Sequence, residues 1–175
     1  APCPPKILPK SKLANTFIVE ALIQKYEEHK PIYRQCLSVE RAAGLELSRE
    51  TLTGSVLAAG ALLQPVAEAL AKELRAGHYI QADETPVPCQ TRSQRGKNHQ
   101  AYLWEISRPD GPVVFYFRMS RGRAGPLEFL QGFRGVLQTD GYAAYDKLGE
   151  GIIHAACAAH VGRQFHRAHE LAPND

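Results

Sequence analysis

The spacing of apolar residues changes near residue 77, and this change limits the fold more than any other feature of the sequence. From about Leu13 to Ala76, apolar residues recur at steps of three and four, the spacing of helices that bury one face. Beyond Gly77 they gather in short runs rich in β-branched and aromatic residues, which is typical of strands. We therefore expect an α+β protein with a proline-rich linker at residues 1–12, a helical region at residues 13–76, and a mixed sheet with helices at residues 77–175.

Three or four helices are expected in the helical region. One apolar stripe predicts a buried helical face, and its members are Ala59, Leu62, Leu63, Val66, Leu70 and Leu74. Pro65 lies inside this stripe and should either kink the helix or begin a new one.

A helix-turn-helix-like pattern lies between Tyr33 and Gly60. One helix should end at Gly44, and Ser48 is suited to cap a second helix that starts at Arg49. The second helix of such a unit can enter the major groove of DNA, where Arg49 would be its cationic contact. An ordinary helical hairpin explains the same pattern, since glycine and serine inside the second helix weaken it.

Five strands are expected after residue 77, at residues 79–82, 101–106, 112–117, 135–139 and 152–156. The second and third should form a hairpin through Pro109-Asp110-Gly111. Short helices are expected near residues 127–133 and 161–171. The first and fourth strands can pair in parallel, which would place Asp83 and Asp140 side by side at strand ends.

Two neighbouring carboxylates repel each other unless a cation lies between them. The pair therefore indicates either an acid/base couple or a site for Mg²⁺, and two such ions about 4 Å apart would support phosphoryl transfer. Each aspartate could instead have a purely local role, Asp83 as a turn cap and Asp140 as the start of an Asp-Gly turn.

Several longer runs resemble one family, the insertion sequence 66 transposases. These runs are Ala82–Val87, Phe129–Tyr145, Cys157–His160 followed by Arg163–Phe165, Pro31–Gln35 and Gly44–Leu52. The resemblance covers nearly the whole chain. It implies a ribonuclease-H-like core whose DDE triad, with Mg²⁺ or Mn²⁺, cleaves and joins DNA strands. Asp83 would be the first catalytic acid and Asp140 the second, both as metal ligands. Transposon ends and target DNA would be the partners, with a homodimer on paired ends.

The chain departs from the family's pattern at the third acid. The family's glutamate lies well downstream, in an Asn-Asn-x-x-Glu-Arg motif absent from these 175 residues. The core is therefore expected to be incomplete at its C-terminal end and inactive in this form. The family's upstream zinc-binding region is also absent, and Ala158 and Gly162 replace its usual Trp and Arg.

Two other functions stay open. Glu170, 30 residues after Asp140, could serve as the third acid of a nuclease with the same fold, although a terminal glutamate is usually only solvated. Alternatively, the chain could be a catalytically inert remnant that binds DNA.

Cationic residues gather between Arg92 and Arg123, where seven of them stand against two acidic residues. Such a strip could neutralise DNA phosphates, or it could be two solvated loops. Beside a DNA-cutting core we favour phosphate contact, with Arg121 as the best ligand because Ser120-Arg121 resembles a serine-arginine loop of the family. The other predicted DNA contacts are Arg92, Lys97, Arg123, His160 and Arg163.

The composition is that of an ordinary globular protein, with 44% hydrophobic residues, 22% charged residues and a formal charge of +3. It excludes disordered, collagen-like and coiled-coil proteins. We expect a cytoplasmic protein without membrane contact, since no run approaches the roughly 18 apolar residues of a membrane span. The four cysteines form no C-x-x-C pair, and Cys157-x-x-His160 alone would be half a zinc site, so neither disulfides nor zinc are expected.

Overall fold

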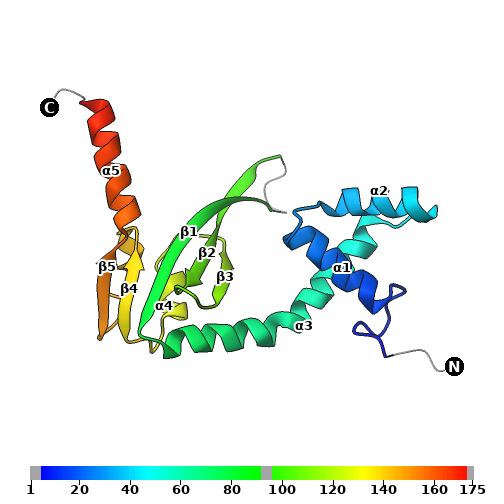
Figure 1. Cartoon of the computed structure of the whole chain (residues 1–175), viewed down its shortest axis with the longest axis horizontal. Helices are drawn as coiled ribbons and strands as arrows, with labels where there is room; N and C mark the ends of the chain where they lie inside the picture. The colour runs from blue at the N-terminus through cyan, green and yellow to red at the C-terminus, as the bar shows by residue number, and fades with distance from the viewer. Residues whose placement is uncertain (1–4, 92–95, 173–175) are drawn as a thin grey trace. The chain divides into compact units, whose positions relative to one another are not determined.

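The computed structural model describes residues 5–91 and 96–172, which form helices and one five-stranded sheet (Figure 1). Contacts within the chain divide it into two compact units, residues 1–66 and 67–175. The division falls inside the long helix α3 (Arg49–Ala76). Each unit has its own hydrophobic core. The expected α+β class, with helices first and a mixed sheet after them, is confirmed.

The first unit consists of α1 (Asn15–Tyr26), α2 (Ile32–Ala43) and the beginning of α3. As predicted, α2 ends at Gly44, which has the left-handed φ of 63° that glycine adopts without strain. Ser48 caps α3, since its Oγ accepts a 3.1 Å hydrogen bond from the Thr51 backbone N–H. The core of this unit is small and is formed by Ala21, Cys36, Leu52 and Val56.

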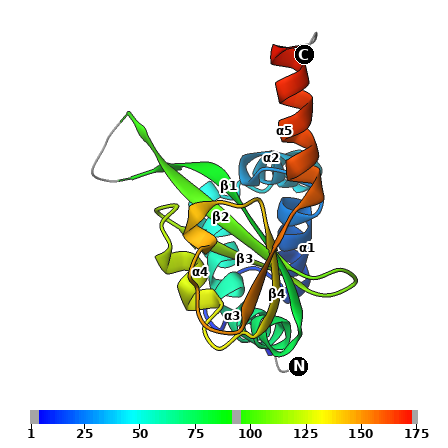
Figure 2. The same ribbon diagram turned by 90° about the vertical axis from the view of Figure 1, so that its left-hand side faces the viewer.

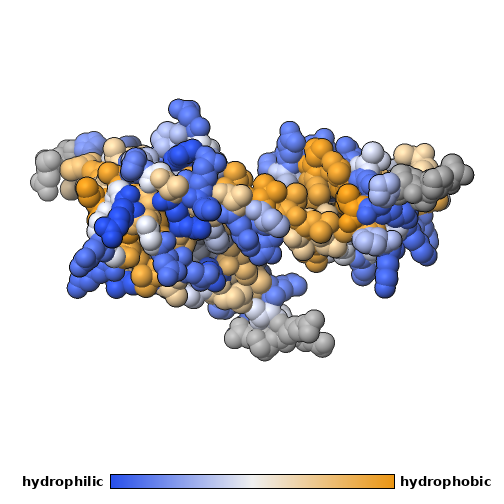
Figure 3. All heavy atoms as spheres, turned by 90° about the horizontal axis from the view of Figure 1, so that it is seen from below, coloured by the Kyte–Doolittle hydropathy of each residue, from blue (hydrophilic) through white to orange (hydrophobic). Residues whose placement is uncertain are grey.

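Helix α3 is one continuous helix of 28 residues, with Pro65 inside it. The predicted buried stripe is wrong for Leu62, Leu63 and Val66, whose exposures are 57%, 53% and 56%. The reason is that each core packs only its own end of the helix, around Leu52 in the first unit and Leu74 in the second. Apolar side chains gather along the middle of α3 in Figure 3.

Among the described residues, α3 is the one helix that is long and apolar enough to cross a membrane, with a mean hydropathy of 1.3 over its most apolar window. Length and composition alone are weak evidence for a membrane span, since core helices of other proteins meet the same criterion. The absence of membrane contact and the cytoplasmic location therefore stay predictions.

The sheet of the second unit has the strand order β3-β2-β1-β4-β5. Its strands are β1 (Tyr79–Gln90), β2 (Asn98–Ser107), β3 (Val113–Arg118), β4 (Gly135–Thr139) and β5 (Ile152–Ala156). The first three strands pair antiparallel, and β4 lies parallel to both β1 and β5. The predicted hairpin and the predicted parallel pairing of the first and fourth strands are confirmed.

Strand β1 is much longer than the predicted residues 79–82. Among the described strands, β1 pairs beyond Gln81 with β2 alone, so one of its edges there has no described strand beside it. Proline is tolerated at such an edge because it lacks an N–H to donate, and Pro86 and Pro88 both lie in this part of β1. Asp83 consequently lies inside β1, which corrects its predicted place at a strand end.

One face of the sheet carries the core of the second unit. There, Ile80, Trp104 and Leu137 pack with residues from the end of α3, from α4 (Ala124–Phe129) and from the 3-10 helix η1 (Ala143–Tyr145). Helix α4 begins three residues before the predicted residue 127. Helix α5 (Ala158–Leu171) follows β5, has no buried residue, and projects from the sheet (Figure 2).

Candidate metal and catalytic site

Asp83 and Asp140 lie at the same level of the sheet because β1 and β4 are in register. The last parallel pair joins Gln81 to Gln138, and each aspartate follows two residues later. Residues two apart on a strand face the same side, so the carboxylates lie beyond the two glutamines. Gln81 Nε2 donates a 2.8 Å hydrogen bond to Gln138 Oε1, which holds the two strands together directly below the site. The structure thus brings the two predicted acids together.

His160 completes a cluster with these two aspartates. One ligand atom from each of the three side chains lies within 4.8 Å of the others, and His160 Nε2 is 4.0 Å from Asp83 Oδ2. The start of α5 is fixed to β4, since Cys157 N–H donates to Thr139 O at 2.9 Å. Because α5 begins at Ala158 and not near residue 161 as predicted, His160 lies in its first turn and close to β4.

Backbone hydrogen bonds orient both carboxylates. Asp83 Oδ1 accepts from the Glu84 N–H, and Asp140 Oδ1 accepts from the Tyr142 N–H, each at 2.8 Å. The second oxygen of each carboxylate faces other side chains of the site, His160 for Asp83 and Arg121 for Asp140. Asp83, Asp140 and His160 line a pocket of about 150 Å³. The other residues that line it are Gln81, Ala82, Glu105, Ser107, Gln138, Thr139 and Cys157. Carboxylates with open oxygens beside an imidazole fit a divalent cation.

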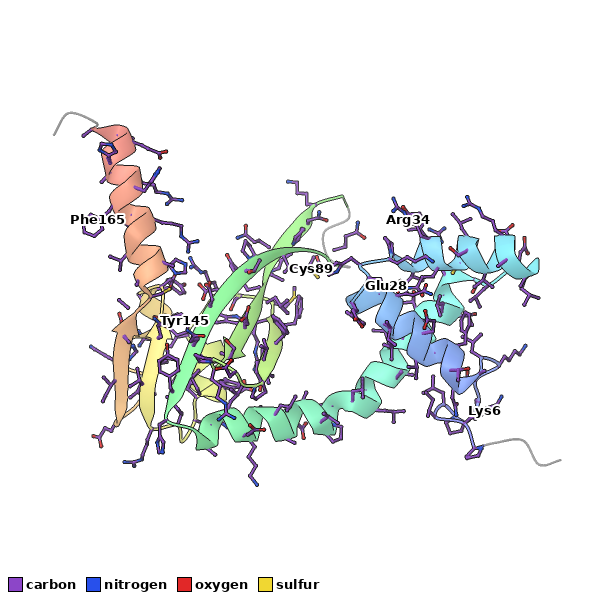
Figure 4. The ribbon with its side chains drawn as sticks, in the orientation of Figure 1. Lys6, Glu28, Arg34, Cys89, Tyr145 and Phe165 are labelled. Carbon is purple, nitrogen blue, oxygen red and sulfur yellow. The ribbon has the colours of Figure 1, made fainter. Side chains whose placement is uncertain are left out.

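Beneath the site lies a buried carboxylate that sequence reasoning missed. The side chain of Glu84 is 1% exposed, and it accepts hydrogen bonds from Arg121 Nε at 2.7 Å and from the Tyr145 hydroxyl at 2.8 Å. Burial and the charge of Glu84 raise the pKa of Tyr145, so this hydroxyl stays a donor. Tyr145 lies beside β1 and β4 in Figure 4. The alternation of side chains along β1 was the signal in the sequence for this buried carboxylate. Ile80 and Ala82 face the core, so Glu84, two residues further on, faces it too, and a carboxylate buried there needs partners.

Arg121, the predicted phosphate ligand, is already engaged with the protein. Its Nη2 lies 2.6 Å from Glu84 Oε1 and 3.9 Å from Asp140 Oδ2, and its guanidinium lies 3.8 Å from the centre of the Tyr142 ring. The side chain still exposes 41% of its surface. Arg121 thus links the core to the site, and its contact with DNA stays a prediction.

The other predicted DNA contacts are spread over the chain. Arg123 donates to Ala143 O at 3.1 Å, Lys97 precedes β2, and Arg163 is exposed on α5. Arg49 begins α3 and belongs to the first unit. Arg92 lies outside the described residues.

Part of the positive charge in the basic strip is neutralised by carboxylates that lie outside that segment. Arg108 pairs with Glu73 at 2.5 Å and Arg118 with Glu128 at 2.6 Å. The excess of cations counted along the sequence therefore overstates the charge that this surface offers to DNA phosphates.

Glu170 is not part of the cluster. It lies ten residues after His160 on α5, which is about 15 Å of helix rise, and it pairs with His166 at 3.5 Å. Helix α5 runs away from the sheet toward the C-terminus (Figure 1), and the Glu170 side chain is 63% exposed.

The described cysteines, Cys36, Cys89 and Cys157, are free thiols. Cys157 opens α5, and its interaction with His160 lowers the pKa of the thiol. The fourth cysteine of the sequence, Cys3, lies outside the described residues.

The chain is similar to known proteins over nearly its whole length. Residues 10–175 match a family model described as "Transposase IS66 family". Two similar curated proteins come from Sinorhizobium fredii (strain NBRC 101917 / NGR234). "Uncharacterized protein y4qI" is 32% identical over 164 residues, covering 84% of this chain and 30% of that protein. "Uncharacterized protein y4hP" is 26% identical over 187 aligned positions, covering 99% of this chain and 33% of that protein. The chain thus spans about a third of the length of these relatives.

Proposed function

Because the chain belongs to the IS66 family of transposases, we propose that it forms part of an enzyme that uses a divalent metal ion to cleave and join DNA strands. The observation that carries this proposal is the cluster of Asp83, Asp140 and His160 beside the end of β4. Paired carboxylates that face open space are the usual ligands of the ions that catalyse phosphoryl transfer.

The sheet supports the proposal that the second unit is a ribonuclease-H-like core. Three antiparallel strands are followed by two parallel ones, in the order β3-β2-β1-β4-β5. This order places the central strand β1 next to β4, so the two acids of the implied DDE triad meet although they are 57 residues apart in sequence.

In this site the protein's own residues would hold and orient the reacting groups. Asp83 and Asp140 would bind Mg²⁺ or Mn²⁺, which supplies charge stabilisation at the scissile phosphate and activation of the attacking oxygen. The Glu84 and Tyr142 backbone N–H groups fix the two carboxylates, which reduces the rearrangement needed on binding. Water and then the freed 3′ hydroxyl would be the successive nucleophiles.

DNA would lie over this side of the sheet. Arg121, Arg123, Lys97, Arg92 and Arg163 are the proposed phosphate contacts of the second unit, and Arg49 is the proposed contact of the helix-turn-helix-like first unit. Neutralising phosphates with these cations makes the binding constant fall steeply with salt. A homodimer would bring two transposon ends together.

The third acid of the triad is proposed to come from a part of the full-length protein beyond these residues, because Glu170 is remote from the pair. We therefore expect the 175-residue chain to bind a divalent metal and DNA without cleaving the DNA. A nuclease that used Glu170 would instead cleave DNA and lose this activity in Glu170→Gln.

Titration calorimetry with Mn²⁺ on the 175-residue chain tests the proposal. Asp83→Asn and Asp140→Asn should each abolish the binding event, since asparagine keeps the shape and the backbone hydrogen bond while it removes the charge. Asp110→Asn is the matched control, because Asp110 lies in the β2–β3 turn with a φ of 54° that asparagine tolerates. This variant should bind Mn²⁺ like the wild type.

Fluorescence anisotropy with a labelled DNA duplex completes the test. Binding should weaken between 50 and 200 mM salt. It should strengthen when Mn²⁺ is added, because a cation held by Asp83 and Asp140 would reduce the repulsion between these carboxylates and the DNA phosphates. A wild-type chain that binds no Mn²⁺ at millimolar concentration, yet binds DNA, would contradict the enzyme proposal and support an inert DNA-binding remnant.

A further inference from the structure

The metal-ligand cluster contains a nitrogen donor that the acid pair alone does not require. Asp83, Asp140 and His160 come from β1, the end of β4 and the first turn of α5, so three different elements converge on one point. Two ligands about 2.1 Å from a common ion lie about 3.0 to 3.5 Å apart in octahedral or tetrahedral geometry. The observed separations, all within 4.8 Å, need only small side-chain rotations to reach these values.

The backbone holds His160 in place for this role. Cys157 N–H donates to Thr139 O at 2.9 Å, which ties the start of α5 to the residue preceding Asp140. His160 N–H then donates to Cys157 O at 3.0 Å, so the histidine belongs to a hydrogen-bonded turn. This turn directs Nε2 toward Asp83 Oδ2, the oxygen that the Glu84 N–H leaves open.

The surroundings of the imidazole agree with a ligand role. His160 is 29% exposed, and its Nδ1 atom is buried and makes no regular hydrogen bond within the described part of the chain. A metal-bound histidine is usually oriented by a second group that contacts its ring, and the Cys157 thiol interacts with His160 here. The Cys157 thiol next to this ring adds a second soft group at the edge of the pocket.

Ligand chemistry decides which ion such a site prefers. Mg²⁺ favours oxygen ligands and retains much of its water, whereas first-row transition ions accept imidazole nitrogen readily. Resting on the proposed function, we infer that His160 is the third metal ligand, and that this site binds first-row transition ions such as Mn²⁺ and Co²⁺ in preference to Mg²⁺.

Metal binding to His160→Gln tests this inference without any measurement of activity. The control is His166→Gln, which changes a histidine on the same helix whose partner is Glu170. With Mn²⁺ and Co²⁺ as separate probes, His160→Gln should weaken binding of each ion about tenfold or more, because the variant loses one of the three proposed metal ligands. It should change Mg²⁺ binding by less than about twofold, and His166→Gln should change none of the three.

A spectroscopic measurement identifies the ligand directly. Pulsed electron paramagnetic resonance of the Mn²⁺-loaded wild type should show coupling to an imidazole nitrogen, and this coupling should vanish in His160→Gln and persist in His166→Gln. Circular dichroism and thermal melting in metal-free buffer establish whether both variants are folded. If His160→Gln unfolds, the wild type still tests the inference, because the absence of nitrogen coupling there would overturn it.

The outcomes separate this inference from the proposed function. If the wild type binds Mg²⁺ and Mn²⁺ equally and shows no nitrogen coupling, His160 is not a ligand, while loss of binding in Asp83→Asn would keep the proposed function intact. If Asp83→Asn and Asp140→Asn bind metal like the wild type, the proposed function and the inference both fail.

Discussion

Arg121 Nη2 lies 2.6 Å from Glu84 Oε1, which joins a half-exposed guanidinium to a carboxylate that is 1% exposed. A buried carboxylate is costly without a charged or hydrogen-bonded partner. Because the same guanidinium lies 3.9 Å from Asp140, this ion pair also supports the candidate metal site.

Arg121→Ala should therefore destabilise the second unit. We expect a loss of about 1 to 3 kcal/mol in the free energy of unfolding, because Glu84 would stay buried with only the Tyr145 hydroxyl as partner. Urea denaturation measures this loss.

Arg118→Ala is the matched control for that loss, since its partner Glu128 is 67% exposed. Exposed ion pairs contribute at most about 1 kcal/mol, so Arg118→Ala should cost clearly less than Arg121→Ala. Equal losses in the two variants would show that Glu84 does not depend on Arg121.

Tyr145→Phe should change how stability depends on pH. The pKa of Tyr145 is raised by burial and by Glu84, while an unfolded tyrosine ionises near about pH 10. The stabilising neutral hydroxyl is therefore fully present below about pH 10, and its contribution is lost as the pH rises beyond that value, because only the unfolded chain then ionises readily.

Urea denaturation at several pH values checks this prediction. At pH 7 the wild type should exceed Tyr145→Phe by about 1.5 to 3 kcal/mol, the contribution of a hydrogen bond to a charged group. The difference should shrink between pH 9 and 11. A difference that stays constant over this range would argue against the hydrogen bond to Glu84.

Mn²⁺ should stabilise the wild type by mass action, by about 2.7 kcal/mol at a free concentration one hundred times the dissociation constant. Asp83→Asn should lose this increase while its metal-free melting temperature stays close to that of the wild type, since Asp83 is 57% exposed. Thermal melting with and without Mn²⁺, followed by a chelator, measures both effects. An unchanged metal response in Asp83→Asn would exclude this residue as a ligand.

Gly135→Ala should disrupt the pairing of β1 with β4. Gly135 has a φ of 149°, and an added Cβ would lie 2.3 Å from the His78 backbone oxygen, so the backbone must shift. We expect a loss of more than about 2 kcal/mol, together with weaker Mn²⁺ binding as the two aspartates separate.

Gly162→Ala is the control for the glycine substitution. An added Cβ there meets no atom within 4 Å, and alanine favours a helix over glycine by about 1 kcal/mol. This variant should be as stable as the wild type or more stable. A harmless Gly135→Ala would show that the β1–β4 register tolerates movement.

The sequence by itself determined the order of helices and strands and pointed to the two acids. Apolar spacing fixed the change from helices to strands near residue 77, and Gly44 and Ser48 marked the helix ends because their backbone and capping chemistry are local. The predicted parallel pairing of the first and fourth strands made Asp83 and Asp140 neighbours, since strand order and right-handed crossovers leave few arrangements. The resemblance to the transposase family implied their role as acids of a triad.

Only the tertiary structure decided which side chains surround the pair. The length of β1, the early start of α5 and the exposure of Leu62 depend on what packs against each segment, and no local pattern contains that information. For the same reason His160 joins the acids while Glu170, on the same helix, does not. Contacts between distant residues are set by the register of β1 with β4 and the attachment of α5 to Thr139, which are properties of the folded chain.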